Sequence, residues 1–321
     1  MKSSWFCKLA VSLVVILVAG FASAATASAD KVLLFGPSVD GGASSIEAQQ
    51  AAAQGFGVDV ADAATWSSMT TAQFAAYRAV VIADNNDSGD VSDLSAAEAN
   101  AGIWGAAVTG NVILSGADAE FHANPLGGDD PGAVTYINRA LGFAAGSPTQ
   151  TGAYVALGGY YNTGSPDAPA KVLDAFAPGG FLMSSRSDDD IHIDPAVAGP
   201  SGLSDSVLSG WGKTTHSYFT RYPSTFKVWA IGRDEPGPYT TSDGESGVPN
   251  FLVRAALPKP IAPTCVVPKL KGQSVKKAKK KLRNHNCKLG KKKGHGKKVK
   301  KQKPKAGTVL PEGGKVKVTV H

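Results

Sequence analysis

The chain has 321 residues, of which 43% are hydrophobic and 18% are charged. This apolar content excludes a chain that is disordered throughout, and it suffices for one sizeable core and one smaller core. Residues 259–321 hold 21 Lys and Arg but a single acid, whereas the rest of the chain holds 12 basic and 25 acidic residues. An acidic body with a basic tail indicates that one part of the chain seeks an anionic surface.

The first 29 residues have the pattern of a secretory signal peptide. Lys2 and Lys8 give a positively charged start and are followed by a short apolar run over 9–20. Ala27, Ser28 and Ala29 then offer small residues for cleavage. The alternative is an uncleaved membrane anchor, but the run is shorter than the roughly 18–20 residues that span a bilayer. We therefore expect a secreted protein, extracellular or associated with the cell wall, without a transmembrane segment after cleavage.

Short apolar runs alternate with helical patterns between residues 30 and 257. We expect strands over 31–35, 58–60, 79–83 and 111–114, and helices over 45–54, 70–77, 92–108 and about 133–143. Parallel strands need helix-length crossovers, so this order predicts a doubly wound, mostly parallel α/β sheet with both faces covered. Further strands are expected over 154–157, 226–231 and 251–256, in an order that the pattern does not give.

The proline-rich stretch 258–263 predicts a stiff linker, and 264–321 predicts a small basic α+β module. Ser274 is placed to cap a helix whose apolar face carries Val275, Ala278 and Leu282. Valines at 316, 318 and 320 then alternate with polar residues, which is the period of a half-buried strand. The helix and strand would bury these apolar stripes against each other.

The order of short segments in this module resembles the PASTA domain. These segments are Val267-Pro268, Gly272-Gln273-Ser274, Lys305-Ala306-Gly307 and Gly314-Lys315-Val316. The resemblance covers 264–321 and implies binding to peptidoglycan or its fragments. Two features depart from it, a lysine-rich insert over 291–303 and the pair Cys265 and Cys287.

Cys265 and Cys287 are expected to form a disulfide, because an exported protein meets an oxidising environment. The alternatives are two free thiols or half of a metal site. The insert contributes a dense cation cluster, which favours any polyanion, including anionic wall polymers. The lysines proposed to bind such a ligand are Lys291, Lys292, Lys293, Lys297, Lys298, Lys300 and Lys301. No aromatic residue interrupts this run for base stacking, so specific nucleic-acid binding is not expected; the alternative is a solvated loop.

The pattern over 31–157 resembles the class I glutamine amidotransferase-like fold, a flavodoxin-like sheet also used by ThuA-like proteins. Enzymes of that class use a cysteine nucleophile, and residues 30–257 contain no cysteine, which excludes this route to glutamine hydrolysis. Ser115 follows the strand where the nucleophile would lie, but Ile113 and Ala117 replace the flanking glycines of a nucleophile elbow. A cap or loop hydroxyl is the alternative role for Ser115.

Asp118 and His122 are four residues apart and would share one helix face near the carboxyl end of this strand, where open α/β sheets bind ligands. They are candidates to hold a metal, orient a sugar or act as a general base, against the alternative of a surface pair without a role. Asp190, His192 and Asp194 form a second candidate metal site, or else a solvated acidic loop.

Three further features are candidates for ligand binding. The polar loop 84–90 resembles the start of a calcium loop, but Ser95 occupies the position of the bidentate Glu. His216 and the pair Tyr160 and Tyr161 would line a carbohydrate cleft or serve only in packing. No cofactor is expected from these patterns.

The combined interpretation is a secreted binding protein of the cell envelope, attached to peptidoglycan or anionic wall polymers by the basic module. The α/β domain is then a ligand-binding domain rather than an enzyme. The alternatives are a secreted hydrolase of wall glycans or peptides, acting through Asp118 and His122, and a purely structural wall protein. The pattern gives no oligomeric state.

Overall fold

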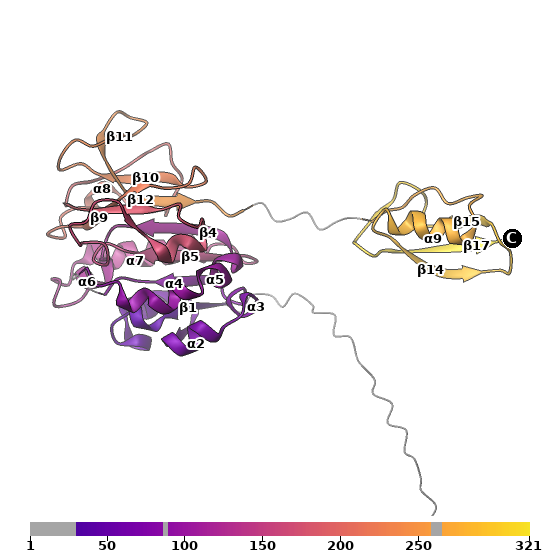
Figure 1. Cartoon of the computed structure of the whole chain (residues 1–321), viewed down its shortest axis with the longest axis horizontal. Coiled ribbons are helices and arrows are strands. Elements are labelled where there is room, and N and C mark those ends of the chain that lie inside the picture. Colours follow the sequence, from indigo (N-terminus) through magenta and orange to yellow (C-terminus); the bar gives the residue numbers. More distant parts are fainter. Residues whose placement is uncertain (1–29, 86–88, 258–264) are drawn as a thin grey trace, which may run out of the picture. The chain divides into compact units, whose positions relative to one another are not determined.

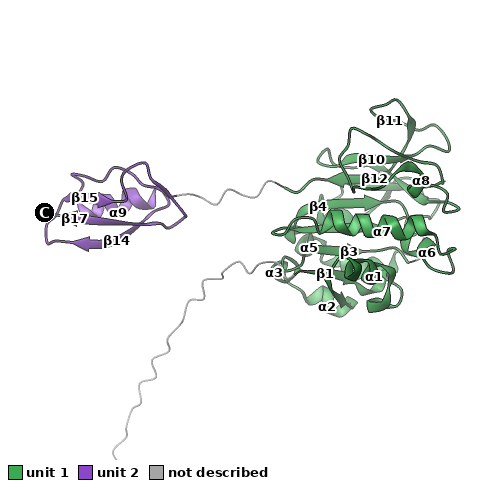
Figure 2. Ribbon diagram, turned by 180° about the vertical axis from the view of Figure 1, so that it is seen from behind, with its two compact units in different colours: residues 1–257 green, residues 258–321 purple. Residues whose placement is uncertain are grey.

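The computed structural model describes residues 30–85, 89–257 and 265–321. The predicted signal peptide and the linker 258–263 lie outside the described residues. The chain forms two compact units, 1–257 and 258–321, which are coloured separately in Figure 2. The first is a mixed α/β domain with a large, mostly parallel sheet, and the second is a small α+β domain.

A nine-stranded sheet forms the centre of the larger unit (Figure 1). Its main order is β2-β1-β3-β5-β4-β12-β10-β8, and β11 pairs with β12. The parallel strands are β1 (Lys31–Phe35), β2 (Gly57–Ala61), β3 (Ala79–Ile82), β4 (Val108–Ser115) and β5 (Thr151–Ala156). The antiparallel extension contains β8 (Ile191–Ile193), β10 (Lys227–Gly232), β11 (Tyr239–Thr240) and β12 (Ser246–Arg254).

Helices cover both faces of this sheet, as the alternation of strands and helices predicted. Along β1, Val32 and Leu34 enter one core, whereas Leu33 and Phe35 enter the other, because successive strand side chains point to opposite faces. The first core lies under α1 (Ile46–Ala53), α6 (Ala119–Ala123), α7 (Pro131–Ala144) and α8 (Asp205–Leu208). The second core lies under α2 (Ala63–Ser68), α3 (Thr71–Phe74), η3 (Ser92–Leu94), α4 (Ser95–Ala99), α5 (Ala101–Ala107) and η4 (Lys171–Ala175).

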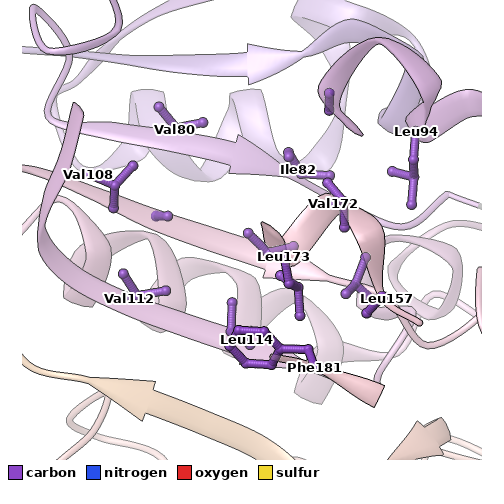
Figure 3. Packing of buried hydrophobic residues seen from close by; sticks show 14 of the residues in the cluster. Val80, Ile82, Leu94, Val108, Val112, Leu114, Leu157, Val172, Leu173 and Phe181 are labelled. Atoms are coloured by element: carbon purple, nitrogen blue, oxygen red, sulfur yellow. The ribbon is translucent and has the colours of Figure 1, made fainter. Parts of the chain in front are cut away.

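Figure 3 shows the second core, to which Val80 and Ile82 of β3, Leu114 of β4, Leu173 and Phe181 all belong. A separate three-stranded antiparallel sheet also contributes to this core. It consists of β6 (Ala168–Pro169), β7 (Leu182–Asp188) and β9 (Thr215–Arg221), in the order β6-β7-β9. The strand and helix patterns in the sequence did not indicate this sheet, because Ser, Asp and Thr dilute the apolar runs. Two short 3-10 helices, η1 (Gly36–Ser38) and η2 (Gly42–Ser44), follow β1.

The smaller unit packs one helix against short strands over its own core. Its elements are β13 (Cys265–Val266), α9 (Val275–Arg283), β14 (Lys288–Lys293), β15 (Val299–Lys303), β16 (Val309–Leu310) and β17 (Lys315–Val320). The Ser274 hydroxyl caps α9 by accepting the Lys277 N–H at 3.3 Å, as expected. The alternating valines of β17 enter the core with Ala278 and Leu282.

The lysine-rich segment 291–303 contributes to two strands of the smaller unit and is not merely a solvated loop. It supplies the end of β14 and all of β15, which flank β17 on either side. Leu289 is half-buried and Val299 is buried, so these two side chains attach the strands to the core. The lysine side chains of the segment remain in solvent. Lysine is well tolerated on edge strands, where it opposes pairing with other chains.

Cys265 and Cys287 are joined by a disulfide, with their Cα atoms 4.8 Å apart. The bond connects β13 to the segment between α9 and β14, as predicted. Within the described part of the chain, no helix has the length and apolar content that crossing a membrane requires.

Candidate functional sites

The carboxyl end of β4 is held in a close contact with β9. Gly116 follows β4, and a Cβ atom at this position would lie only 1.9 Å from the Ser217 carbonyl oxygen, so glycine is required. The Gly116 N–H donates to the Asn250 carbonyl at 2.8 Å, and the Gly116 carbonyl accepts the His216 N–H at 2.9 Å. This contact fixes the start of β9 beside the loop that begins α6.

Asn250 reinforces the same junction from β12. Its side chain is fully buried, and its amide nitrogen donates to the Thr215 hydroxyl and to the Ser217 carbonyl, both at 2.9 Å. Its side-chain oxygen accepts the Gly232 N–H. Asn250 therefore ties β9 and β10 to the end of β4. Asn250 could not be recognised as a functional residue from the sequence, because an isolated Asn in an apolar run carries no local signal.

Asp118, His122 and His216 come together in this junction. The His122 Nε2 atom lies 3.2 Å from Asp118 Oδ1, and the His216 Nε2 atom lies 3.4 Å from Asp118 Oδ2. The two imidazole rings are stacked, with centroids 5.9 Å apart and planes 18° apart. One ligand atom from each residue lies within 4.8 Å of the others, and all three side chains are buried.

The expected pairing of Asp118 with His122 across one helical turn is present in this structure, since the His122 N–H also donates to the Asp118 carbonyl at 3.3 Å. His216 completes the cluster from a strand distant in the sequence. Burial lowers the pKa of His122, but interactions with the Asp118 carboxylate and with nearby backbone carbonyls outweigh burial and raise this pKa above its usual value. The arrangement offers two imidazole nitrogens and one carboxylate to a common ligand.

Ser115 is fully buried at the end of β4, in register with Ala156 of β5 and Phe251 of β12. The structure therefore buries this hydroxyl in the interior of the domain.

A pair of buried carboxylates, Glu47 on α1 and Glu120 on α6, lies on the same side of the sheet as this cluster. Burial raises the pKa of Glu47 to about 7, against the lowering effect of its backbone hydrogen bond. Burial and the nearby Glu47 charge raise the pKa of Glu120 to about 10. The Glu120 Oε1 atom accepts the Asp40 N–H at 2.8 Å. The Glu120 carboxyl therefore holds its proton at neutral pH, whereas Glu47, with its pKa of about 7, exchanges its proton in that range.

The second candidate metal site, formed by Asp190, His192 and Asp194, does not converge on one point. Asp190 pairs with Arg233 at 3.1 Å, and the Asp194 carboxylate accepts the Ser242 hydroxyl. His192 instead lies between two other carboxylates, with Nδ1 at 2.8 Å from Asp205 and Nε2 at 3.1 Å from Asp243. Burial lowers the pKa of His192, but both carboxylates raise it, and the net shift is upward.

The loop 84–90 is described only in part, because 86–88 lie outside the described residues. Asp84 is buried, and its carboxylate accepts the Gly159 N–H at 2.8 Å. Asp90 accepts the Ser92 N–H at 2.8 Å. Tyr160 and Tyr161 are buried and belong to the core with α2 and α5, which is the packing alternative for these rings.

Two basic grooves lie on the smaller unit. The helix groove, between α9 and β14, has a volume of about 1260 Å³ and is lined by Lys276, Lys277, Lys279, Lys280, Arg283, Asn286, Cys287, Lys288, Leu289, Glu312 and Gly313. The sheet groove, beside β15 and β17, has a volume of about 710 Å³ and is lined by Lys291, Lys293, Lys301, Gln302, Lys303, Pro304, Lys305, Lys317, Val318 and Thr319.

Three of the seven lysines singled out in the sequence line the sheet groove, namely Lys291, Lys293 and Lys301. The other four, Lys292, Lys297, Lys298 and Lys300, are exposed but line neither groove. The larger helix groove was missed, although the lysines of α9 already formed the polar face of an amphipathic helix in the sequence. That pattern was the signal that could have located it.

Comparison with family models identifies residues 266–321 as a PASTA domain. The C-terminal unit is therefore a PASTA domain with a disulfide between Cys265 and Cys287. A comparison with curated proteins found no match to the chain.

Proposed function

We propose that this chain is an exported binding protein of the cell envelope, held at the wall by its PASTA domain. PASTA domains generally occur in wall-associated proteins and bind peptidoglycan or β-lactams. The observation that carries the proposal is that basic side chains line two grooves on this domain. Each groove has six of them, and those of the helix groove include Arg283 and Lys288. Glu312 is the single acid in residues 259–321.

Electrostatics supports an anionic ligand for these grooves. Lysine ammonium groups are hydrated point charges, and a cluster of them attracts a polyanion with a strength that falls as salt screens the field. Residues 259–321 contain no Phe, Trp or Tyr, the large aromatic side chains on which the bases of single strands stack, and this disfavours specific nucleic-acid binding. The proposed partners are therefore peptidoglycan carboxylates or anionic wall polymers.

The export part of the proposal rests on the signal-like pattern over 1–29 and on the disulfide. A disulfide persists in oxidising compartments and is rare in reducing ones. The Cys265–Cys287 bond is compatible with an extracellular or wall location of the PASTA domain.

For the α/β domain we propose ligand binding rather than cysteine chemistry. The resemblance to the amidotransferase-like fold is part of this proposal, and the absence of cysteine from residues 30–257 removes the nucleophile of that class. Polar side chains gather at the carboxyl ends of the parallel strands, where such sheets bind ligands. These include Asp84 after β3 and Asp118 after β4.

The test uses two full-length variants with the same loss of charge. In the first, Lys276, Lys279, Lys280 and Arg283 of the helix groove are changed to Gln; in the second, Lys292, Lys297, Lys298 and Lys300 outside both grooves are changed to Gln. Exposed charge pairs contribute about 0.2–1 kcal/mol each, so the first variant should bind purified peptidoglycan about tenfold or more weakly. The second variant should retain most of the affinity. Binding by the first variant at the wild-type level would contradict the role of the helix groove, and equal losses would indicate a diffuse charge effect.

A further inference from the structure

We propose that Asp118, His122 and His216 form a binding site for a divalent transition-metal ion in the α/β domain, and that Zn²⁺ is the ion that fits it best. This inference is independent of the PASTA domain and goes beyond wall attachment. It rests on the geometry, burial and chemistry of the three side chains.

The distances between the donor atoms match those around a bound zinc ion. Zinc binds imidazole nitrogens and carboxylate oxygens at about 2.0–2.2 Å, and tetrahedral angles then place neighbouring donors roughly 3.4 Å apart. The Asp118 Oδ1 atom lies 3.2 Å from His122 Nε2, and the Asp118 Oδ2 atom lies 3.4 Å from His216 Nε2. One donor atom from each residue lies within 4.8 Å of the other two, so a small rotation of the imidazoles brings these three atoms around one ion.

The burial of Asp118 supplies a second, independent reason for a cation. Its side chain is fully buried, yet neither carboxylate oxygen has a hydrogen-bond partner among the described residues. The His122 Nε2 atom lies at ion-pair distance from Asp118 without hydrogen-bond geometry. An ionised carboxylate is costly to bury without a charged or hydrogen-bonding partner. A metal ion between Asp118 and the histidines would remove that cost.

The backbone holds the three donors in place without the ion. Asp118 and His122 are joined through the first turn of α6, and His216 is anchored by its N–H to the Gly116 carbonyl. Trp211 packs beside the His122 ring, with centroids 5.9 Å apart, and restricts its rotation. Such support around the donors is what keeps a metal site in its binding geometry.

The donor set indicates the type of ion and its coordination. Two imidazoles and one carboxylate suit zinc and other borderline divalent ions, whereas calcium and magnesium prefer oxygen donors alone. Three protein ligands leave one tetrahedral position for water or a ligand, which distinguishes this set from the four-ligand structural zinc sites.

The test is a zinc titration of the untagged, metal-free full chain. Binding is monitored through the NMR resonances of the imidazole nitrogens of its six histidines. The proposal predicts that two of the six, His122 and His216, shift together and saturate at about one Zn²⁺ per chain. Co²⁺ in place of Zn²⁺ should give the visible absorption of a four- or five-coordinate site. These readouts need no mutation, so they hold even where a variant fails to fold.

Variants then assign the site. Asp118→Asn and His122→Gln should each weaken Zn²⁺ binding at least about tenfold. The matched control is His192→Gln, which removes another buried histidine of the same domain and should leave the stoichiometry unchanged. The proposal is overturned if His122 and His216 do not shift at stoichiometric Zn²⁺, or if Asp118→Asn binds as tightly as the wild type.

Discussion

At the scale of single residues, Glu47 is a buried carboxyl of the α/β domain whose pKa is raised. Burial raises its pKa from an ordinary value of 4.5 to about 7, and Glu120 and Asp40 are its acidic neighbours. A carboxyl whose pKa is higher in the folded state binds a proton on folding. Its contribution to stability is therefore complete below about pH 4.5 and is lost as the pH rises through 7.

We predict that the free energy of unfolding of the wild type falls by up to about 3 kcal/mol between pH 5 and pH 8 through this group, since one pKa unit corresponds to about 1.4 kcal/mol. In Glu47→Gln this part of the slope should disappear, because an amide does not ionise. Chemical denaturation at a series of pH values measures both slopes. The same slope in the two proteins would show that Glu47 ionises normally in the folded state.

At the scale of elements, the disulfide between Cys265 and Cys287 fixes β13 to the end of α9 across a separation of 22 residues. Closing a loop of this length lowers the entropy of the unfolded chain and contributes about 3 kcal/mol. We predict that Cys265→Ala with Cys287→Ala destabilises the PASTA domain by about this amount. The domain contains no Trp, Tyr or Phe, so amide hydrogen exchange in α9 is the suitable measurement. Unchanged protection of these amides would contradict the prediction.

The sequence predicted the helices and strands that are defined by interactions between residues near in sequence. The strand β1, the helix α1 with its Ser45 cap, and the alternating strand β17 all follow from apolar period and capping residues near in sequence. The helix expected over 92–108 is instead η3, α4 and α5. It breaks at Asn100, whose side chain accepts the Trp66 indole N–H at 3.0 Å and donates to the Trp66 carbonyl at 2.8 Å. That contact comes from α2, an element that sequence reasoning missed.

The candidate metal site was also predictable only in part, because one of its three residues joins it from a segment distant in sequence. Asp118 and His122 lie one helical turn apart, and this spacing is visible in the sequence. His216 joins them through the close approach of Gly116 to Ser217, and the contact depends on β9, which pairs with β7 outside the main sheet. A spatial contact between distant loops leaves no periodic signal in either segment.

At the scale of the whole molecule, the chain consists of two units with opposite charge. The acidic α/β domain has two cores and buried polar groups, and the PASTA domain has one small core and a basic surface. The strong charge of the second unit follows directly from its composition. The grooves that present this charge depend on how α9 packs against β14, which composition alone does not give.

The most direct test of wall attachment is co-sedimentation of the full chain with purified peptidoglycan, with and without its anionic polymers, over a series of salt concentrations. The chain truncated after Leu257 serves as the comparison, because the two units separate at this residue. The account predicts that the full chain sediments at low salt, that salt releases it steeply, and that the truncated chain stays in solution. Equal sedimentation of the truncated chain would show instead that the α/β domain recognises the wall.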